Sequence, residues 1–254
     1  MSDETLQPED VENFVAQTNN AQAIETTEKV RTRESEIQTN IDFWKNLALE
    51  GIEVNENEIR AAIEVLPEVE GFDWYIAIPE GVKTSEVWQK VITRYPNDPS
   101  LNELNGLKLP RETKETFAVA ARYSKKPDAV REEGLVKSAK DWERSMSVYE
   151  SPNWEIAEHT YMSPLERVVA ELRWNAENGT HLDEGDEITF CPGSRTTDGR
   201  VLGMHFNTLY NNCTFNSYDP STKKWNLRVR QVVTKDTKVE SNTNFFEQRP
   251  YPTK

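Results

Sequence analysis

The sequence predicts an α+β protein, in which a helix-rich N-terminal region precedes a small domain of one helix and antiparallel strands. Before residue 150, apolar residues recur mainly at steps of three and four, as in amphipathic helices. After residue 186 they tend to alternate with polar residues in short runs that turn residues separate, as in β-strands. Because 254 residues are many for one compact domain, we expect two, residues 34–150 and 151–254.

Residues 1–33 differ in composition from the rest of the chain. They are acidic and rich in Glu, Gln, Thr and Asn, with only scattered apolar side chains. Such a segment buries too little apolar surface to offset the entropy that it would lose on folding. We therefore expect it to be a disordered tail.

Two helices are predicted at the start of the first domain. In the first, Ile37, Ile41 and Trp44 form one apolar stripe, and Gly51 is expected to end the helix. The second is expected over residues 56–66, with Pro67 as its terminator.

The remainder of the first domain combines strands and helices. Aromatic and β-branched residues predict a strand over 73–79, and Thr84 opens a further amphipathic helix that Pro96 ends. Residues 115–124 fit either type, but we favour a strand because the strand over 73–79 needs a partner. Residues 135–149 predict another helix.

The strongest local signal marks a helix that begins at Ser163. Ser163 is expected to be the N-cap, Pro164 takes the first helical position, Glu166 completes a capping box, and Gly179 ends the helix. The apolar stripe expected to be buried comprises Leu165, Val168, Val169, Leu172 and Ala176. Strands are then predicted over residues 187–190, 200–206, 213–218 and 225–233.

Composition narrows the classes of partner. The net charge of −14 repels phosphate backbones, so we expect no nucleic-acid partner, and the basic residues Lys223, Lys224, Arg228 and Arg230 are interpreted as solvated charges on a strand. An apolar run of about 18 residues is absent from the sequence, so we expect no membrane insertion. Without an apparent leader, the chain is expected to be cytoplasmic, with Cys191 and Cys213 reduced.

Three C-terminal segments carry a resemblance to known sequences. ERVVAELRWNAENGTHLD, ITFCPGSRTTDGRVLGMHF and LRVRQVV together resemble the C-terminal region of uncharacterised proteins of candidate-phylum bacteria. Those proteins carry an ELK-like helix, an ETG-HLD turn, a GSR-x-x-DG-x-V stretch and an LRAR-like strand. The present chain departs from them at Glu177-Asn178-Gly179 and at Val229. The resemblance implies kinship but no activity.

The stretch His205 to Asp219 combines Asn, Tyr, Phe, Ser and Thr within this framework. A variable segment of that composition on a fixed frame is similar to the targets of diversity-generating retroelements, whose variable sites lie on C-type-lectin-like folds. An ordinary polar hairpin would have the same composition, so both interpretations stay open.

The composition of this stretch also favours binding on physical grounds. Tyr and Phe give rigid contact area, and Asn, Ser and Thr give adaptable hydrogen bonds, as in antibody paratopes. We place a candidate binding segment at 200–225, and its candidate residues are Tyr210, Asn211, Asn212, Phe215, Asn216 and Tyr218. Because strand alternation divides these residues between two faces, the alternative is that Phe206, Phe215 and Tyr218 belong to the core.

Catalytic and metal signals are weak. A Cys/His hydrolase would use Cys191 with His181 or His205, and His181 could lie beside the Asp183 carboxylate, but the flanking sequence does not support this. The acidic residues Glu184, Asp186 and Glu187 lack the spacing of an EF-hand and fit a solvated turn. We therefore expect no enzyme activity, no cofactor and no metal ion.

Two hypotheses for function remain from the sequence. The first is a recognition protein that presents the segment 200–225 to a small ligand or a partner protein. The second is an intracellular structural or adaptor protein that makes its contacts through the acidic helices before residue 70.

Overall fold

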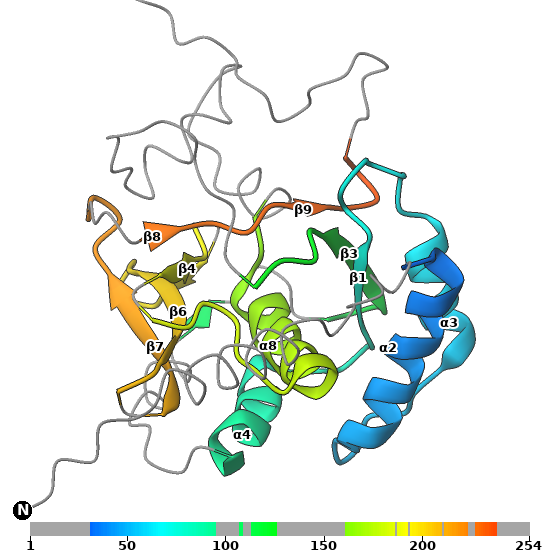
Figure 1. The fold of residues 1–254 in the computed structure, drawn as a ribbon, viewed down its shortest axis with the longest axis horizontal. Helices are drawn as coiled ribbons and strands as arrows, with labels where there is room; N and C mark the ends of the chain where they lie inside the picture. Colours follow the sequence, from blue (N-terminus) through cyan, green and yellow to red (C-terminus); the bar gives the residue numbers. More distant parts are fainter. Residues whose placement is uncertain are drawn as a thin grey trace, which may run out of the picture. The chain divides into compact units, whose positions relative to one another are not determined.

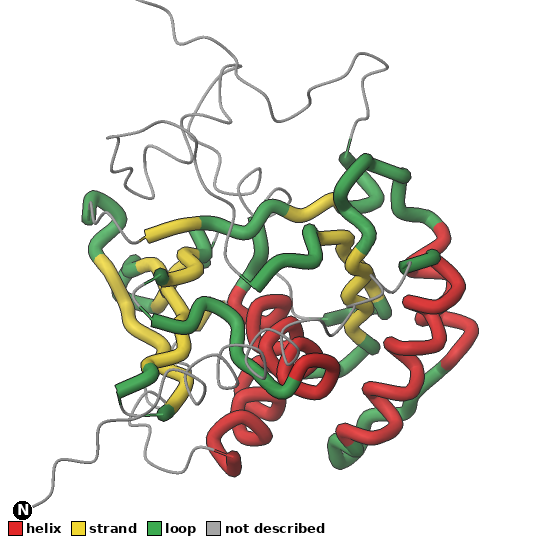
Figure 2. The backbone as a smooth tube through the Cα atoms, viewed as in Figure 1, coloured by secondary structure: helices red, strands yellow, loops and turns green. Residues whose placement is uncertain are grey.

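A computed structural model of the chain describes residues 31–94, 107–108, 113–125, 161–185, 187–192, 194–209, 211–222 and 227–237. Residues 1–30 of the predicted tail and the predicted helix over 135–149 lie outside these ranges. Helices and strands both occur (Figure 2), and the strands form antiparallel and mixed sheets, so the predicted α+β class is confirmed. No helix of the described residues is long and apolar enough to span a bilayer.

The two predicted N-terminal helices are present. α2 spans Arg33–Leu47 and begins with a capping box at Thr32 and Ser35, and α3 spans Glu56–Glu64 with Asn55 as its N-cap. α2 ends at Ala48, which has a left-handed backbone, and not at Gly51 as expected from the sequence. The N–H of Ala48 is bonded to the Trp44 carbonyl, so the helix closes before the glycine is reached.

A three-stranded antiparallel sheet has the order β1-β3-β9. Its strands are β1 (Trp74–Ile78), β3 (Phe117–Ala121) and β9 (Val232–Val233). β3 pairs with β1 along its whole length, which confirms the strand predicted at 115–124 and its partner. α2 and α3 both contact this sheet (Figure 1).

Side chains cover the open edge of β1. Asn40 of α2 donates to the Tyr75 carbonyl and accepts from the Ala77 N–H, and the Trp44 indole donates to the Ala77 carbonyl over 2.7 Å. These bonds replace those that a further strand would make. α2 is therefore fixed in register against the sheet.

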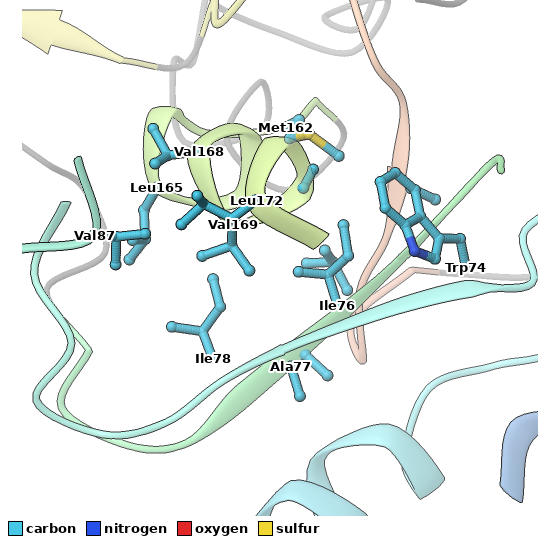
Figure 3. Close-up of a cluster of buried hydrophobic side chains, with 14 of the residues drawn as sticks. Trp74, Ile76, Ala77, Ile78, Val87, Met162, Leu165, Val168, Val169 and Leu172 are labelled. Atoms are coloured by element: carbon cyan, nitrogen blue, oxygen red, sulfur yellow. The ribbon is translucent and has the colours of Figure 1, made fainter. Parts of the chain in front are cut away.

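The helix predicted at Ser163 is α8, Pro164–Asn178, with the expected capping box and with Gly179 left-handed at its end. Figure 3 shows Leu165, Val169 and Leu172 facing Ile76 and Ile78 of β1, whereas Ala77 points away. α8 also contacts β6 and the helix α4, Thr84–Arg94. Ala176, which was expected to be buried, is exposed. The burial of α8 otherwise extends beyond the predicted apolar stripe, since four charged side chains are buried: Glu166, Arg167, Glu171 and Arg173.

A four-stranded mixed sheet has the order β7-β6-β4-β8. It is built from β4 (Ile188–Phe190), β6 (Val201–Asn207), β7 (Asn212–Tyr218) and β8 (Leu227–Arg228). Two short strands, β2 (Leu107–Lys108) and β5 (Arg195–Thr196), pair separately. The strands predicted from period two are thus present, apart from the last.

The single strand predicted over 225–233 is divided between the two sheets. β8 pairs with β4, whereas β9 pairs with β3 of the other sheet (Figure 1). Arg230 lies between them and is buried, which corrects its interpretation as a solvated charge. Described residues on both sides of residue 150 therefore share one sheet and one hydrophobic core.

Gly199 lies in the turn between β5 and β6 and has φ of +83°. A Cβ atom at this position would meet no atom within 4 Å, so only backbone strain opposes a side chain. We predict that Gly199→Val lowers the free energy of unfolding by about 1–2 kcal/mol, whereas Gly199→Asn costs less because Asn tolerates this conformation. Urea unfolding measures both changes, and equal stability of the Val variant would contradict the assigned turn.

Candidate functional site

The candidate binding segment folds as the hairpin β6–β7. Seven residue pairs join the two strands in antiparallel register, from Val201↔Tyr218 to Asn207↔Asn212. Among the described strands, β7 lies at the edge of its sheet. Since directly paired residues share a face, the register divides the hairpin into an inner and an outer face.

The inner face is apolar and buried. It carries Leu202, Met204, Phe206, Cys213 and Phe215, all of which belong to the main core. The Phe215 ring packs edge-on against Trp88 of α4, with ring centroids 4.6 Å apart. Phe215 is 1 % exposed, so it cannot take part in the predicted binding surface.

Tyr218 is also buried, at the base of the outer face. It belongs to a second apolar cluster, in which its ring lies edge-on to Phe190 at 5.9 Å. Gly203 makes room for this packing, because a Cβ atom there would lie 2.8 Å from Ile188 and 2.9 Å from Tyr218. The alternative that Phe206, Phe215 and Tyr218 are core residues is therefore confirmed.

The outer face becomes polar toward the tip of the hairpin. His205, Asn207, Thr214 and Asn216 lie on it and are partly exposed, and we call these four residues the polar face. Asn212 pairs with Asn207 in the register, but its side chain lies outside the described part of the structure.

The tip of the hairpin is exposed. The Asn207 side-chain oxygen accepts from the Leu209 N–H over 3.0 Å, and Asn211 has a left-handed backbone with φ of +51°. Leu209 is 89 % exposed. Asn211 is also exposed, and Tyr210 lies outside the described residues.

A buried ion cluster lies behind the hairpin, and we call Arg167, Asp183 and Arg230 the ion cluster. Arg167 donates through Nε and Nη2 to one Asp183 oxygen over 3.1 and 2.9 Å, and Arg230 donates to the other. All three side chains are at most 4 % exposed. No local pattern in the sequence indicates this cluster, because a charged residue on a helix or a turn normally faces water.

The electrostatics of the ion cluster keep Asp183 charged. Burial acts to raise the pKa of Asp183, but the charges of Arg230 and Arg167 outweigh burial and hold the pKa below its usual value. Thr189 of β4 adds a hydrogen bond to the same carboxylate. Arg230 also donates to the carbonyls of Ser124 and Lys125, both over 2.9 Å, so the cluster reaches the chain after β3.

The structure pairs His181 with a different carboxylate from the one expected. Its Nδ1 atom lies 2.8 Å from Glu171, whereas Asp183 is bound by the two arginines. Cys191 is fully buried, and burial raises the pKa of its thiol, so it is poorly suited to act as a nucleophile. The cysteine that lies near His181 and Glu171 is Cys213.

The acidic turn after α8 is held by hydrogen bonds. Glu184 accepts from the Lys125 ammonium over 2.6 Å and from the His181 N–H over 2.9 Å. Its carboxylate is thus occupied by protein donors, which fits a structural turn. Asp186 lies outside the described residues.

Comparisons with protein-family models, with curated proteins and with solved structures found no match to the chain. The resemblance to candidate-phylum and retroelement-target proteins therefore stays a prediction that rests on the sequence motifs.

Removing the charge of Asp183 tests the ion cluster. We predict that Asp183→Asn lowers the free energy of unfolding by about 3–5 kcal/mol at neutral pH, because two arginines stay buried without their anion. Lys83→Gln breaks the exposed pair with Glu86 and serves as the control, with an expected cost below about 1 kcal/mol. Similar costs for the two variants, measured by urea unfolding, would contradict the role of the cluster.

The same variant has a predicted pH dependence. A carboxyl whose pKa is lower in the folded chain stabilises it above the unfolded pKa of about 3.9, and this contribution is lost as the pH falls through the folded pKa. The stability difference between wild type and Asp183→Asn should therefore be largest near pH 7 and should narrow below about pH 4. A difference that stays constant down to pH 2 would show that Asp183 does not titrate with folding.

Proposed function

We propose that the chain is a recognition protein that binds a partner protein through the polar face and the tip of the β6–β7 hairpin. The observation that carries the proposal is the division of this hairpin into a buried apolar face and a partly exposed polar one. The candidate residues narrow accordingly to the outward positions, since Phe215 and Tyr218 are buried.

The chemistry of the polar face suits hydrogen-bonded recognition. An imidazole, a hydroxyl and two amides supply both donors and acceptors within two paired strands. Leu209 adds an apolar contact at the tip, and an apolar anchor beside polar groups is a common composition of protein interfaces. β7 lies at the sheet edge among the described strands, and an edge strand offers backbone groups of the kind that a partner strand can pair with.

The rigidity of the hairpin supports the same function. Its inner face is fixed by Trp88 of α4 and by the main core, so binding need not order the two strands. A surface that is ordered before binding loses less conformational entropy when the partner arrives. This arrangement favours a preformed binding surface.

The adaptor hypothesis has less support. Acidic residues of α2 and α3 form ion pairs with basic residues of the same two helices, as between Glu34 and Arg60 and between Lys45 and Glu56. Exposed pairs of this kind are normal on solvated helix surfaces. They favour no particular partner.

A site-specific photo-crosslinker tests the proposed surface. Introduced at Leu209 in the full chain, within cells that naturally make it, the crosslinker should give an adduct of one defined mass. Val65, the other exposed large apolar residue among the described ones, is the matched control and should not give this adduct. Adding Thr214→Arg should reduce the Leu209 adduct at least about tenfold, because a bulky charge would stand on the polar face.

The proposal would be wrong if Leu209 gave no adduct, or if Val65 gave the same one. It would also be wrong if Thr214→Arg left the Leu209 adduct unchanged while the variant stayed folded by circular dichroism.

If the segment is diversified, the two faces predict where its changes occur. Among close relatives, substitutions should concentrate at 205, 207–212, 214 and 216, and should spare Met204, Phe206, Cys213 and Phe215, because the latter pack in the core. Aligned sequences of relatives give the measurement. Equal variation at inward and outward positions would contradict a selected binding face.

A further inference from the structure

Glu171, His181 and Cys213 bring three metal-binding side chains together behind the hairpin. One ligand atom from each lies within 4.8 Å of the other two. The residues come from three separate elements: Glu171 from α8, His181 from the turn after it, and Cys213 from the inner face of β7. Their proximity therefore results from the tertiary fold and not from closeness in the sequence.

The surroundings hold each of these side chains in place. The His181 ring stacks on Phe206 at 3.6 Å with an interplanar angle of 7°, and Phe206 pairs directly with Cys213 in the hairpin register. Glu171 turns one oxygen toward His181 Nδ1, at 2.8 Å. Its other oxygen accepts from Arg167 over 3.0 Å and from the Leu182 N–H over 3.3 Å.

We propose that Glu171, His181 and Cys213 form a zinc site. Carboxylate oxygen, imidazole nitrogen and thiolate sulfur are the three donor types that Zn²⁺ takes from proteins. Around a tetrahedral zinc ion these atoms would stand about 3.3–3.6 Å apart. The contact between His181 Nδ1 and Glu171, now 2.8 Å, has to open by about half an ångström to reach this spacing, and the three ligand atoms already lie within 4.8 Å of one another.

The burial of the thiol favours a metal ion over a covalent substrate. Cys213 is 1 % exposed and belongs to the main core, so an organic electrophile could reach its sulfur only after the hairpin had opened. A zinc ion needs far less room. The His181 side chain, which is 14 % exposed, marks the side from which the ion and a water molecule as fourth ligand can enter.

The outer partners of the site resemble those that orient metal ligands in general. Zinc ligands are held by hydrogen bonds to further residues, and here the Leu182 N–H and Arg167 hold Glu171. The positive charges of Arg167 and Arg230 are opposed by Asp183 and Glu171. Binding of zinc with loss of the thiol proton adds one positive unit of charge to a chain whose net charge is −14.

A zinc ion at this position would join α8, the following turn and β7. It would therefore stabilise the inner face of the hairpin against the helix. This inference is independent of the proposed recognition function, because it concerns the opposite face of the hairpin.

Metal titration of the full chain tests the proposal. After treatment with a chelator, the protein should bind one equivalent of Zn²⁺, and Co²⁺ should give a sulfur-to-cobalt charge-transfer band in the near ultraviolet. Cys213→Ser should abolish the band and weaken Zn²⁺ binding by more than the about 10- to 100-fold that the loss of an outer partner costs. Cys191→Ser is the matched control, since Cys191 is equally buried and lies outside the group.

The site would be disproved by a folded wild type that shows no cobalt–sulfur band. The site would also be disproved if the Cys213→Ser variant retained wild-type affinity for Zn²⁺, or if the Cys191→Ser variant lost the cobalt–sulfur band. If Cys213→Ser fails to fold, His181→Gln provides the second variant, and unchanged zinc affinity in that variant would overturn the assignment.

Discussion

The rest of the structure depends on one interaction, the buried ion pairing of the Asp183 carboxylate with Arg167 and Arg230. It joins α8, the turn after α8 and the chain between β8 and β9, and Thr189 adds β4. Burying two arginines and one carboxylate is costly unless all of them meet, so this pairing admits few alternative arrangements of the chain. We therefore regard the ion cluster as a determinant of the correct arrangement more than as a source of stability.

The position of the hairpin follows from this arrangement. The Phe206 N–H of β6 donates to the Asp183 carbonyl over 3.3 Å, and the Asp183 N–H donates to the Lys125 carbonyl over 3.1 Å. The same residue thus connects the end of β3 with the hairpin. Once β6 is fixed, the register commits one face of β6–β7 to the core and leaves the other to carry His205, Thr214 and Asn216.

Elements with strong local signals could be predicted from the sequence. α8 is the clearest example, since Ser163, Glu166 and Gly179 act as the capping residues that their positions indicate. The pairing of β1 with β3 also followed from local pattern and from the need for a partner strand.

Features that depend on distant partners could not be predicted. Arg173 looks like a surface residue of an amphipathic helix, yet it is buried with Glu36 of α2, 3.1 Å away. In the same way, the division of 225–233 between two sheets depends on Arg230 meeting Asp183, which no local pattern reveals. Within the hairpin, alternation divided the candidate residues between two faces, but it could not show that Phe215 packs against Trp88 of α4, because that contact joins distant parts of the chain.

Native-state hydrogen exchange, compared between wild type and Asp183→Asn, tests the central role of the ion cluster most directly. If the cluster joins the two sheets into one cooperative unit, the free energy of opening measured at amides of β3 should fall in the variant by the same amount as that measured at amides of β6. Loss of protection confined to one sheet, with the other unchanged, would contradict this account.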